Sequence, residues 1–206
     1  MGSEPPLFII ATGNAHKAAE FAQLFAIHGV NARVCSAAET VGMPHVLEDA
    51  NSFHDNALKK AAAVRAIAPP EAWVLADDSG LLCDALNGAP GIHSARYAGE
   101  GQPDSAHRAK LLDVLRGMDG PMRRAHFFCQ LVVLAADGRE QSFCGICPGK
   151  ILRTEIGTGG FGYDPIFQPD EFDCNFAELT LDEKNRHSHR GRAFTAMVCA
   201  LKKDLQ

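Results

Sequence analysis

Leu7 to Lys17 read LFIIATGNAHK, which is an apolar run, a polar turn and the beginning of a helix. The consecutive apolar residues Leu7 to Ala11 predict a buried strand, because neither face of the run carries a polar side chain. After the turn, apolar residues recur at helical spacing, at Ala18, Phe21, Ala22 and Phe25. A strand that leads through a tight turn into a helix is typical of α/β folds, so this stretch predicts that fold class.

The rest of the chain alternates between strand and helix patterns without a linker-like break. We expect further strands near residues 30–34 and 73–76, helices over 52–66, 104–117 and 188–205, and hairpins over 81–88 and 127–144. Residues 36–51 show no period and predict a loop. Strands and helices alternate early and hairpins dominate the middle, which predicts a mixed sheet flanked by helices in one domain over residues 1–206.

Composition limits the partners that the protein can have. Lys and Arg number 20 and Asp and Glu number 25, so the net charge of −5 disfavours a basic nucleic-acid-binding protein. No apolar run approaches the roughly 20 residues that a membrane-spanning helix needs, so we expect no membrane partner. Seven cysteines without framework spacing indicate a cytoplasmic protein. The C-x-x-C pair Cys144 and Cys147 is interpreted as part of a strand, because no second ligand pair follows it.

The turn from Thr12 to Lys17 is a candidate phosphate site. Free backbone N–H groups at a helix N-terminus attract anions, and Gly13 permits close approach of a ligand. Lys17 adds a positive charge. The spacing differs from a Walker A loop, so the alternative is an ordinary strand–turn–helix connection.

Two adjacent carboxylates, Asp77 and Asp78, follow the predicted strand at 73–76. Ionising both is costly without a cation, and a hard divalent ion such as Mg²⁺ would relieve their repulsion. The alternative is a solvated acidic turn. Glu48 is a candidate third carboxylate, although no local pattern shows that it faces the same site.

The segment Gly157 to Gly162 reads GTGGFG and matches the dinucleotide-binding pattern G-x-G-x-x-G. Tyr163-Asp164-Pro165 follows and prevents the helix that such a site requires. We interpret the segment as a flexible loop that presents Phe161 for stacking on a base. Further along, Lys184, Ser188, His189 and Arg190 gather hydrogen-bond donors before the last helix, a pattern that suits a phosphate or an oxo group. A metal site at His187 and His189 is the less favoured reading.

Six motifs in this order resemble the inosine triphosphate pyrophosphatase family, whose bacterial members hydrolyse dITP and XTP. They begin at Thr12, Phe53, Ala76, Gly88, Gly157 and Ala177 and read T-G-N-x-x-K, F-x-[ED]-N-A, A-D-D-S-G-L, G-A-P-G-I-x-S-A-R-Y, G-T-G-G-F-G-Y-D-P-I-F and A-E-L-T-x-x-E-K-x-x-x-S-H-R-G. The resemblance implies a two-lobed α/β homodimer with a long mixed sheet and an active-site cleft between the lobes. It also implies an enzyme that uses Mg²⁺, with Mn²⁺ as an alternative ion, to convert dITP, ITP or XTP to the monophosphate and pyrophosphate and so cleanse the nucleotide pool.

The resemblance also implies a role for each matching residue. Asp78 would be the general base, and Ser79 would contact substrate. The metal ligands would be Glu48, Asp78 and, less firmly, Asp77. Phosphate would be held by Thr12, Gly13, Asn14, Ala15, His16, Lys17 and Lys184. The purine end would be held by Phe161, Gly162, Tyr163, Asp164, His189 and Arg190.

Three positions depart from the family pattern. Ala15-His16 replaces the commoner Pro-Gly, Asp55 replaces a Glu, and Cys147 stands where many members have Trp. Two other functions were weighed. A Maf-like pyrophosphatase acting on pyrimidine or modified nucleotides is disfavoured by the S-H-R-G segment, and a non-enzymatic nucleotide sensor is disfavoured by the retained carboxylates and Lys17.

Overall fold

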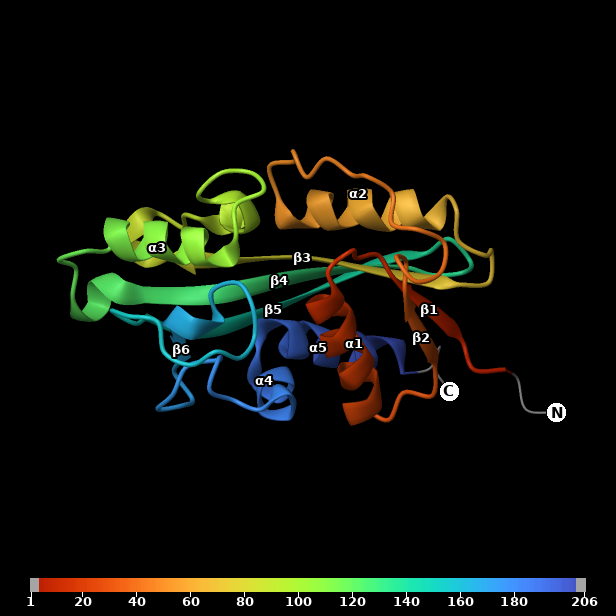
Figure 1. Ribbon diagram of the computed structural model, residues 1–206. Helices are drawn as coiled ribbons and strands as arrows, with labels where there is room; N and C mark the ends of the chain where they lie inside the picture. The colour runs from red at the N-terminus through yellow and green to blue at the C-terminus, as the bar shows by residue number, and fades with distance from the viewer. Residues whose placement is uncertain (1–3, 203–206) are drawn as a thin grey trace. The chain divides into compact units, whose positions relative to one another are not determined.

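A computed structural model describes residues 4–202, and its six strands form one sheet in the order β2-β1-β3-β4-β5-β6 (Figure 1). The strands are β1 (Leu7–Ile10), β2 (Arg33–Ser36), β3 (Trp73–Cys83), β4 (Arg124–Leu134), β5 (Glu140–Ile151) and β6 (Phe167–Pro169). The α-helices are α1 (Ala15–Ile27), α2 (Phe53–Arg65), α3 (Asp104–Val114), α4 (Leu181–His187) and α5 (His189–Leu201). Within residues 4–202, no helix has the length and apolar character needed to cross a membrane.

The sheet combines both strand directions. Strand β1 pairs in parallel with β2 and with β3, while β5 pairs antiparallel with β6. Parallel neighbours require a crossover connection, which α1 and α2 provide. The predicted α/β class with a mixed sheet is therefore confirmed.

The chain divides into two compact units. The first comprises Met1–Asp78, Cys129–Gly145 and Arg190–Gln206, and the second comprises Ser79–Phe128 and Ile146–His189. Strands β3, β4 and β5 each contribute residues to both units. A single two-lobed domain with a cleft between the lobes stays a prediction.

The core of the first unit follows the alternation of side chains along β1. Phe8 and Ile10 belong to a buried cluster with residues of α1 and α5, whereas Ile9 belongs to a second cluster with residues of α2. Successive side chains of a strand point to opposite faces, so one apolar run serves two cores. Accordingly, α2 lies on one face of this part of the sheet and α1 and α5 lie on the other (Figure 1).

The core of the second unit is rich in aromatic rings. Phe127 packs edge-on against Phe167 with ring centroids 4.6 Å apart, and it stacks on Phe176 at 5.9 Å. Leu81 and Leu111 are buried in the same cluster. Such ring pairs add to the free energy gained by burying their apolar area.

Some boundaries differ from the prediction. The 127–144 hairpin is present as β4 and β5, but the hairpin predicted over 81–88 is wrong. Strand β3 continues to Cys83, and its residue Leu82 is joined to Pro90 by an isolated antiparallel bridge in place of a second strand. Proline has no N–H to donate, so a second strand does not extend from that bridge. Strand β2 begins later than the 30–34 pattern suggested, and Leu205 of the predicted last helix lies outside the described residues.

Helix α4 was not predicted. Thr180 and Glu183 form a reciprocal capping box at its beginning. The sequence T-x-x-E at these positions is the signature of such a cap, so the signal was present. The helix spans only 7 residues, too few to show an apolar period.

Candidate active site

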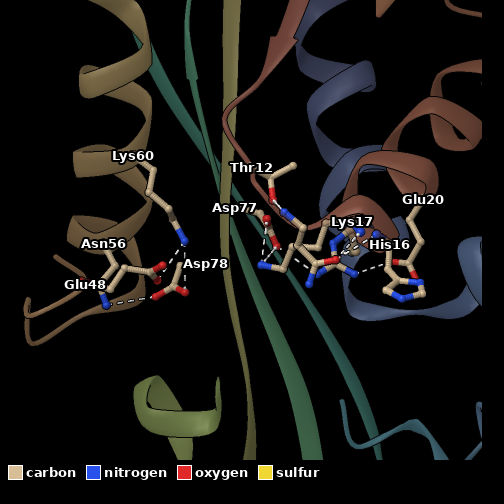
Figure 2. A network of polar contacts seen from close by, with 11 residues as sticks. Thr12, His16, Lys17, Glu20, Glu48, Asn56, Lys60, Asp77 and Asp78 are labelled. Atoms are coloured by element: carbon tan, nitrogen blue, oxygen red, sulfur yellow. Dashed lines mark hydrogen bonds and ion pairs between the residues drawn. The ribbon is translucent and has the colours of Figure 1, made fainter. Parts of the chain in front are cut away.

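Strand β3 carries Asp77 and Asp78 to opposite faces of the sheet (Figure 2). Figure 2 shows the Asp77 side chain beside Lys17 of α1 and the Asp78 side chain beside Lys60 of α2. From the sequence alone, the two adjacent carboxylates were expected to share one neutralising ion. Because side chains alternate along a strand, each carboxylate instead has its own set of partners.

The Asp77 cluster consists of Lys17, Glu20, Asp77 and Arg190. Lys17 Nζ donates to both oxygens of Asp77, at 3.0 and 2.9 Å, and Arg190 Nη2 donates to Oδ2 at 3.0 Å. Asp77 is only 2% exposed. Burial favours its protonated form, but the charges of Lys17 and Arg190 outweigh that effect and hold the pKa of Asp77 well below its usual value.

Arg190 lies inside this cluster with 1% of its surface exposed. Its second terminal nitrogen donates to Glu20, and the two carboxylates raise the pKa of Arg190 in spite of its burial. The residue was expected at the purine end, and the contacts found are to Asp77 and Glu20. Glu20 was missed by sequence reasoning, although its spacing from Lys17 places both on one face of α1.

The Asp78 cluster consists of Glu48, Asn56, Lys60 and Asp78. Asn56 Nδ2 donates to Asp78 Oδ2 at 3.1 Å, and Lys60 Nζ lies 3.5 Å from Asp78 Oδ1. The same ammonium donates to Glu48 Oε2 at 3.0 Å. Glu48 and Asp78, which were singled out from the sequence, are thus bound to one cation.

Sequence reasoning singled out neither Asn56 nor Lys60 for the site. Asn56 stands in the motif F-x-[ED]-N-A, and Lys60 follows four residues later. That spacing places both side chains on one face of α2, so the helical period could have found them.

Burial raises the pKa of Asp78 to about 6, and the charge of Glu48 acts in the same direction. Lys60, Lys17 and the hydrogen bond from Asn56 oppose the shift. At neutral pH the carboxyl is mostly ionised, yet it is a stronger base than an ordinary aspartate. Asp78 therefore suits proton abstraction from water.

The donor set at Asp78 fits a magnesium ion. Among the three charged side chains of this cluster, two carboxylates share one ammonium, which leaves one negative charge. Mg²⁺ prefers one or two carboxylates together with phosphate oxygens and waters. Across the described residues, no group of three or more His, Cys, Asp and Glu side chains is arranged for a metal ion.

The loop before α1 is closed by its own side chains. Asn14 Oδ1 accepts from the N–H groups of His16 and Lys17, at 2.9 and 3.2 Å, and Thr12 Oγ1 accepts from Asn14 N. A phosphate at this helix terminus would compete with the Asn14 cap for two of these groups. Beside the loop lies a cavity of about 300 Å³, lined by residues of β1, α1 and β2 and by Thr12, Gly13, Asn14 and Ala15.

In the second unit, Phe161, Asp164 and Lys184 are brought together. Asp164 Oδ2 accepts from Lys184 Nζ at 2.6 Å and from the N–H of Phe161 at 2.8 Å. The Lys184 ammonium lies 4.6 Å from the centre of the Phe161 ring. Tyr163 donates its hydroxyl to the Ser94 carbonyl at 2.8 Å. The loop predicted as flexible is therefore anchored by named contacts.

The remaining candidates have different surroundings. His189 is 4% exposed and stacks on Phe127, with centroids 4.6 Å apart and planes 10° apart. His187 is bonded to Glu171 at 2.6 Å, so the two histidines of the H-x-H pair have separate partners. Ser79 is half-buried in β3.

Known proteins match this chain over almost its whole length. A family model described as the Ham1 family matches residues 8–200, a range that includes both clusters and the 157–162 loop. The chain is 50% identical over 193 residues to a dITP/XTP pyrophosphatase of Opitutus terrae, covering 92% of this chain and 95% of that protein. It is 46% identical over 185 residues to a dITP/XTP pyrophosphatase of Desulforamulus reducens, covering 90% of each.

Solved structures agree with the sequence matches. The Ham1 protein of Staphylococcus aureus superposes with a TM-score of 0.81 at 36% identity, covering 96% of this chain and 99% of that one. A structure from Mycobacterium abscessus, described as a nucleoside-triphosphatase / dITP/XTP pyrophosphatase, gives a TM-score of 0.72 at 37% identity, with coverage of 95% and 99%.

Proposed function

The chain belongs to the Ham1 family, and on that premise we propose that it hydrolyses dITP, ITP and XTP to the nucleoside monophosphate and pyrophosphate. The observation that carries the proposal is the buried Asp78, whose raised pKa and contacts with Asn56 and Lys60 suit a general base. The name shared by the similar proteins supplies the substrate class. Removal of deaminated purine nucleotides from the nucleotide pool is the role that follows.

In the proposed reaction, Asp78 accepts a proton from water as the water oxygen attacks the α-phosphorus. The bond from that phosphorus to the bridging oxygen breaks, and pyrophosphate leaves with its electron pair. Asn56 and Lys60 orient the carboxylate by hydrogen bonding and charge. Glu48 and Asp78 hold the Lys60 ammonium between them, so this cation offsets part of their negative charge beside the attacked phosphorus.

We assign the metal site of this proposal to Glu48 and Asp78. A bound Mg²⁺ or Mn²⁺ would neutralise phosphate charge and help to acidify the attacking water. Asp77 is given a different role, because Lys17 and Arg190 already bind its oxygens. Asp77 holds Lys17 at the beginning of α1, where the lysine ammonium can bind a phosphate of the substrate.

The purine end is proposed to stack on Phe161 and to meet the ammonium of Lys184, which Asp164 holds beside the ring. Hypoxanthine and xanthine carry a 6-oxo acceptor where adenine carries an amino donor. The ammonium of Lys184 offers only donors, so adenine would place donor against donor. A preference for oxo-purines over adenine follows.

A cytoplasmic location and a homodimer also belong to the proposal. The seven cysteines all lie within residues 4–202 and form no disulfide there, which supports a reducing compartment. Light scattering coupled to size exclusion would measure the oligomeric state, and a mass of one chain would contradict the dimer.

The decisive experiment measures pyrophosphate release across a panel of nucleoside triphosphates with and without Mg²⁺. We expect dITP, ITP and XTP to be hydrolysed far faster than ATP, whose base lacks the 6-oxo group, and than GTP, whose base has a 2-amino group that hypoxanthine and xanthine lack. Hydrolysis should require the ion. A preference for pyrimidine or modified nucleotides would instead support the Maf-like alternative. Heat release on ITP binding without product would support a nucleotide sensor.

A further inference from the structure

Helix α3 holds both polar backbone groups of Gly162. Asp104 Oδ2 accepts from the N–H of Gly162 at 2.6 Å, and Arg108 Nη1 donates to its carbonyl at 2.8 Å. The two side chains are four residues apart, so they leave α3 on the same face. Hydrogen bonds that involve a charged partner are stronger than neutral ones, and here two of them converge on one residue.

Arg108 also holds the beginning of the same segment. Its other terminal nitrogen lies 2.9 Å from Glu155 Oε2, and its side chain is only 13% exposed. One guanidinium therefore joins Glu155, just before the glycine-rich loop, to Gly162, the last residue of that loop. A lysine at this position could not make both contacts with the same fixed geometry.

The loop is held from its other side by Asp164. That carboxylate binds the N–H of Phe161 and the ammonium of Lys184, and it lies close against Gly160. A Cβ atom at Gly160 would overlap Asp164 Oδ2, so any other residue at this position would displace the carboxylate. Asp164 thus holds the backbone of Phe161, and the α3 side chains hold the next residue, Gly162.

We propose that Asp104 and Arg108 are positioning residues that fix the Phe161 ring for stacking on the nucleobase. Both side chains bind the backbone of Gly162, the residue next to Phe161, and so act on the ring through that residue. The inference rests on the proposed function only for the identity of the ligand, an oxo-purine nucleotide. If the contacts merely supported the fold, their loss would lower stability without a specific effect on the base.

The kinetic test uses Asp104→Ala and Arg108→Ala with ITP as substrate. We expect KM to rise about tenfold in each variant, the loss typical of one charge-assisted hydrogen bond, while kcat stays within about threefold. Inorganic tripolyphosphate, which lacks the base, is used as the competing ligand, and its inhibition constant should be the same in the variants as in the wild type. Arg108→Lys should recover part of the loss, because an ammonium can still donate to the Gly162 carbonyl.

The structural test measures amide hydrogen exchange. Residues 157–163 should exchange faster in both variants, while the rest of the chain keeps its protection. The double variant should raise KM by less than the product of the single effects, because both bonds hold the same residue. Arg116→Ala is the matched control, since this arginine follows α3, is 82% exposed and pairs only locally with Asp113.

Thermal unfolding is measured first, and Asp104→Asn replaces the alanine variant if that variant does not fold. The inference is overturned if KM and loop exchange both match the wild type. It is also overturned if ITP and tripolyphosphate are weakened equally, because that result indicates a general structural effect. A wild-type protein that hydrolyses no nucleotide would refute the proposed function instead, and the exchange measurement would still test the α3 contacts.

Discussion

The properties of Asp78 come from its surroundings and not from its residue type. It is 7% exposed, and burial raises its pKa although Lys60 opposes the shift. A carboxyl that is costly to ionise is a stronger base. The burial of ionised Asp78 therefore lowers the stability of the folded protein and favours proton abstraction from water.

Replacement of Asp78 by Asn should separate catalysis from folding. We expect kcat for ITP to fall by about 10²–10⁴, the usual contribution of a general base, because the amide cannot accept a proton. The free energy of unfolding at pH 7 should not fall, since the amide carries no charge to bury. Pyrophosphate release and urea unfolding measure the two quantities.

The matched control for this variant is Asp49→Asn. That carboxylate also pairs with a lysine of α2, Lys59, but its side chain is 67% exposed. Its activity should equal that of the wild type. A fully active Asp78→Asn enzyme would exclude Asp78 as the base.

The titration of Asp78 gives a second prediction at this scale. In the metal-free protein, NMR of the Asp78 carboxyl carbon should show a midpoint near the pKa of about 6. Because the folded pKa lies above the ordinary value, the contribution of Asp78 to stability falls as pH rises from about 4 to 6. Addition of Mg²⁺ should lower the midpoint. A midpoint below about 4 without metal would contradict the assignment.

At the scale of an element, the beginning of α1 has two functions at one residue. Asn14 caps the helix through two backbone N–H groups, and the same turn is the proposed phosphate site. Asn14→Ala should lower the free energy of unfolding by about 1 kcal/mol, the typical value of an N-cap. Asn14→Asp should keep the stability, because Asp caps equally well, but should raise KM by adding a negative charge beside the phosphates.

Thermal unfolding and ITP kinetics of the two Asn14 variants would separate these functions. If Asn14→Asp binds ITP as well as the wild type does, the phosphates lie elsewhere. If Asn14→Ala leaves stability unchanged, the cap contributes nothing measurable.

A second prediction at this scale concerns the glycine-rich loop. Gly160 has φ +69° and faces Asp164, whereas Gly101 has a similar φ of +70° with no atom near its absent Cβ. Both alanine variants should lose stability through backbone strain, of the order of 1–3 kcal/mol. Only Gly160→Ala should also raise KM for ITP, because its methyl group displaces the carboxylate that orients Phe161 and Lys184. Equal KM values in the two variants would contradict this role.

At the scale of the molecule, the Asp77 cluster joins distant parts of the first unit. Asp77 lies 60 residues from Lys17 and 113 residues from Arg190 along the chain, yet it binds both. Its lowered pKa means that it stabilises the fold above the ordinary aspartate pKa, and that this contribution is lost as pH falls.

Asp77→Asn should therefore unfold more easily at pH 7, by about 3–5 kcal/mol, because it removes the counter-charge that Lys17 and Arg190 share and leaves Arg190 with Glu20 alone. Its stability should also depend less on pH below about 4 than that of the wild type. Urea unfolding between pH 3 and 7 measures both effects. Asp113→Asn, at a carboxylate 65% exposed, should match the wild type at each pH. An unchanged acid profile in Asp77→Asn would refute this account.

Local patterns were sufficient for much of the fold. The apolar run of β1, the period of α1 and the turn between β4 and β5 each act among near neighbours, so each could be read from a few consecutive residues. The same holds for the candidate residues Asp78 and Lys17, whose types and motifs were visible, whereas no local pattern indicated Glu48. The short helix α4 and the true end of β3 were not found, because they depend on one capping pair and on packing.

The partners of those residues had to come from the folded chain. Asp77 and Asp78 are adjacent in the sequence, which suggested one site. In β3 their side chains point to opposite faces of the sheet, so they belong to two clusters with different charges. Arg190 was expected beside a purine and lies with Glu20 and Asp77. Burial sets the pKa of Asp78, and contacts between residues far apart in the chain set the partners of Arg190. Neither property can be read from the neighbouring residues in the sequence, because both depend on the folded surroundings.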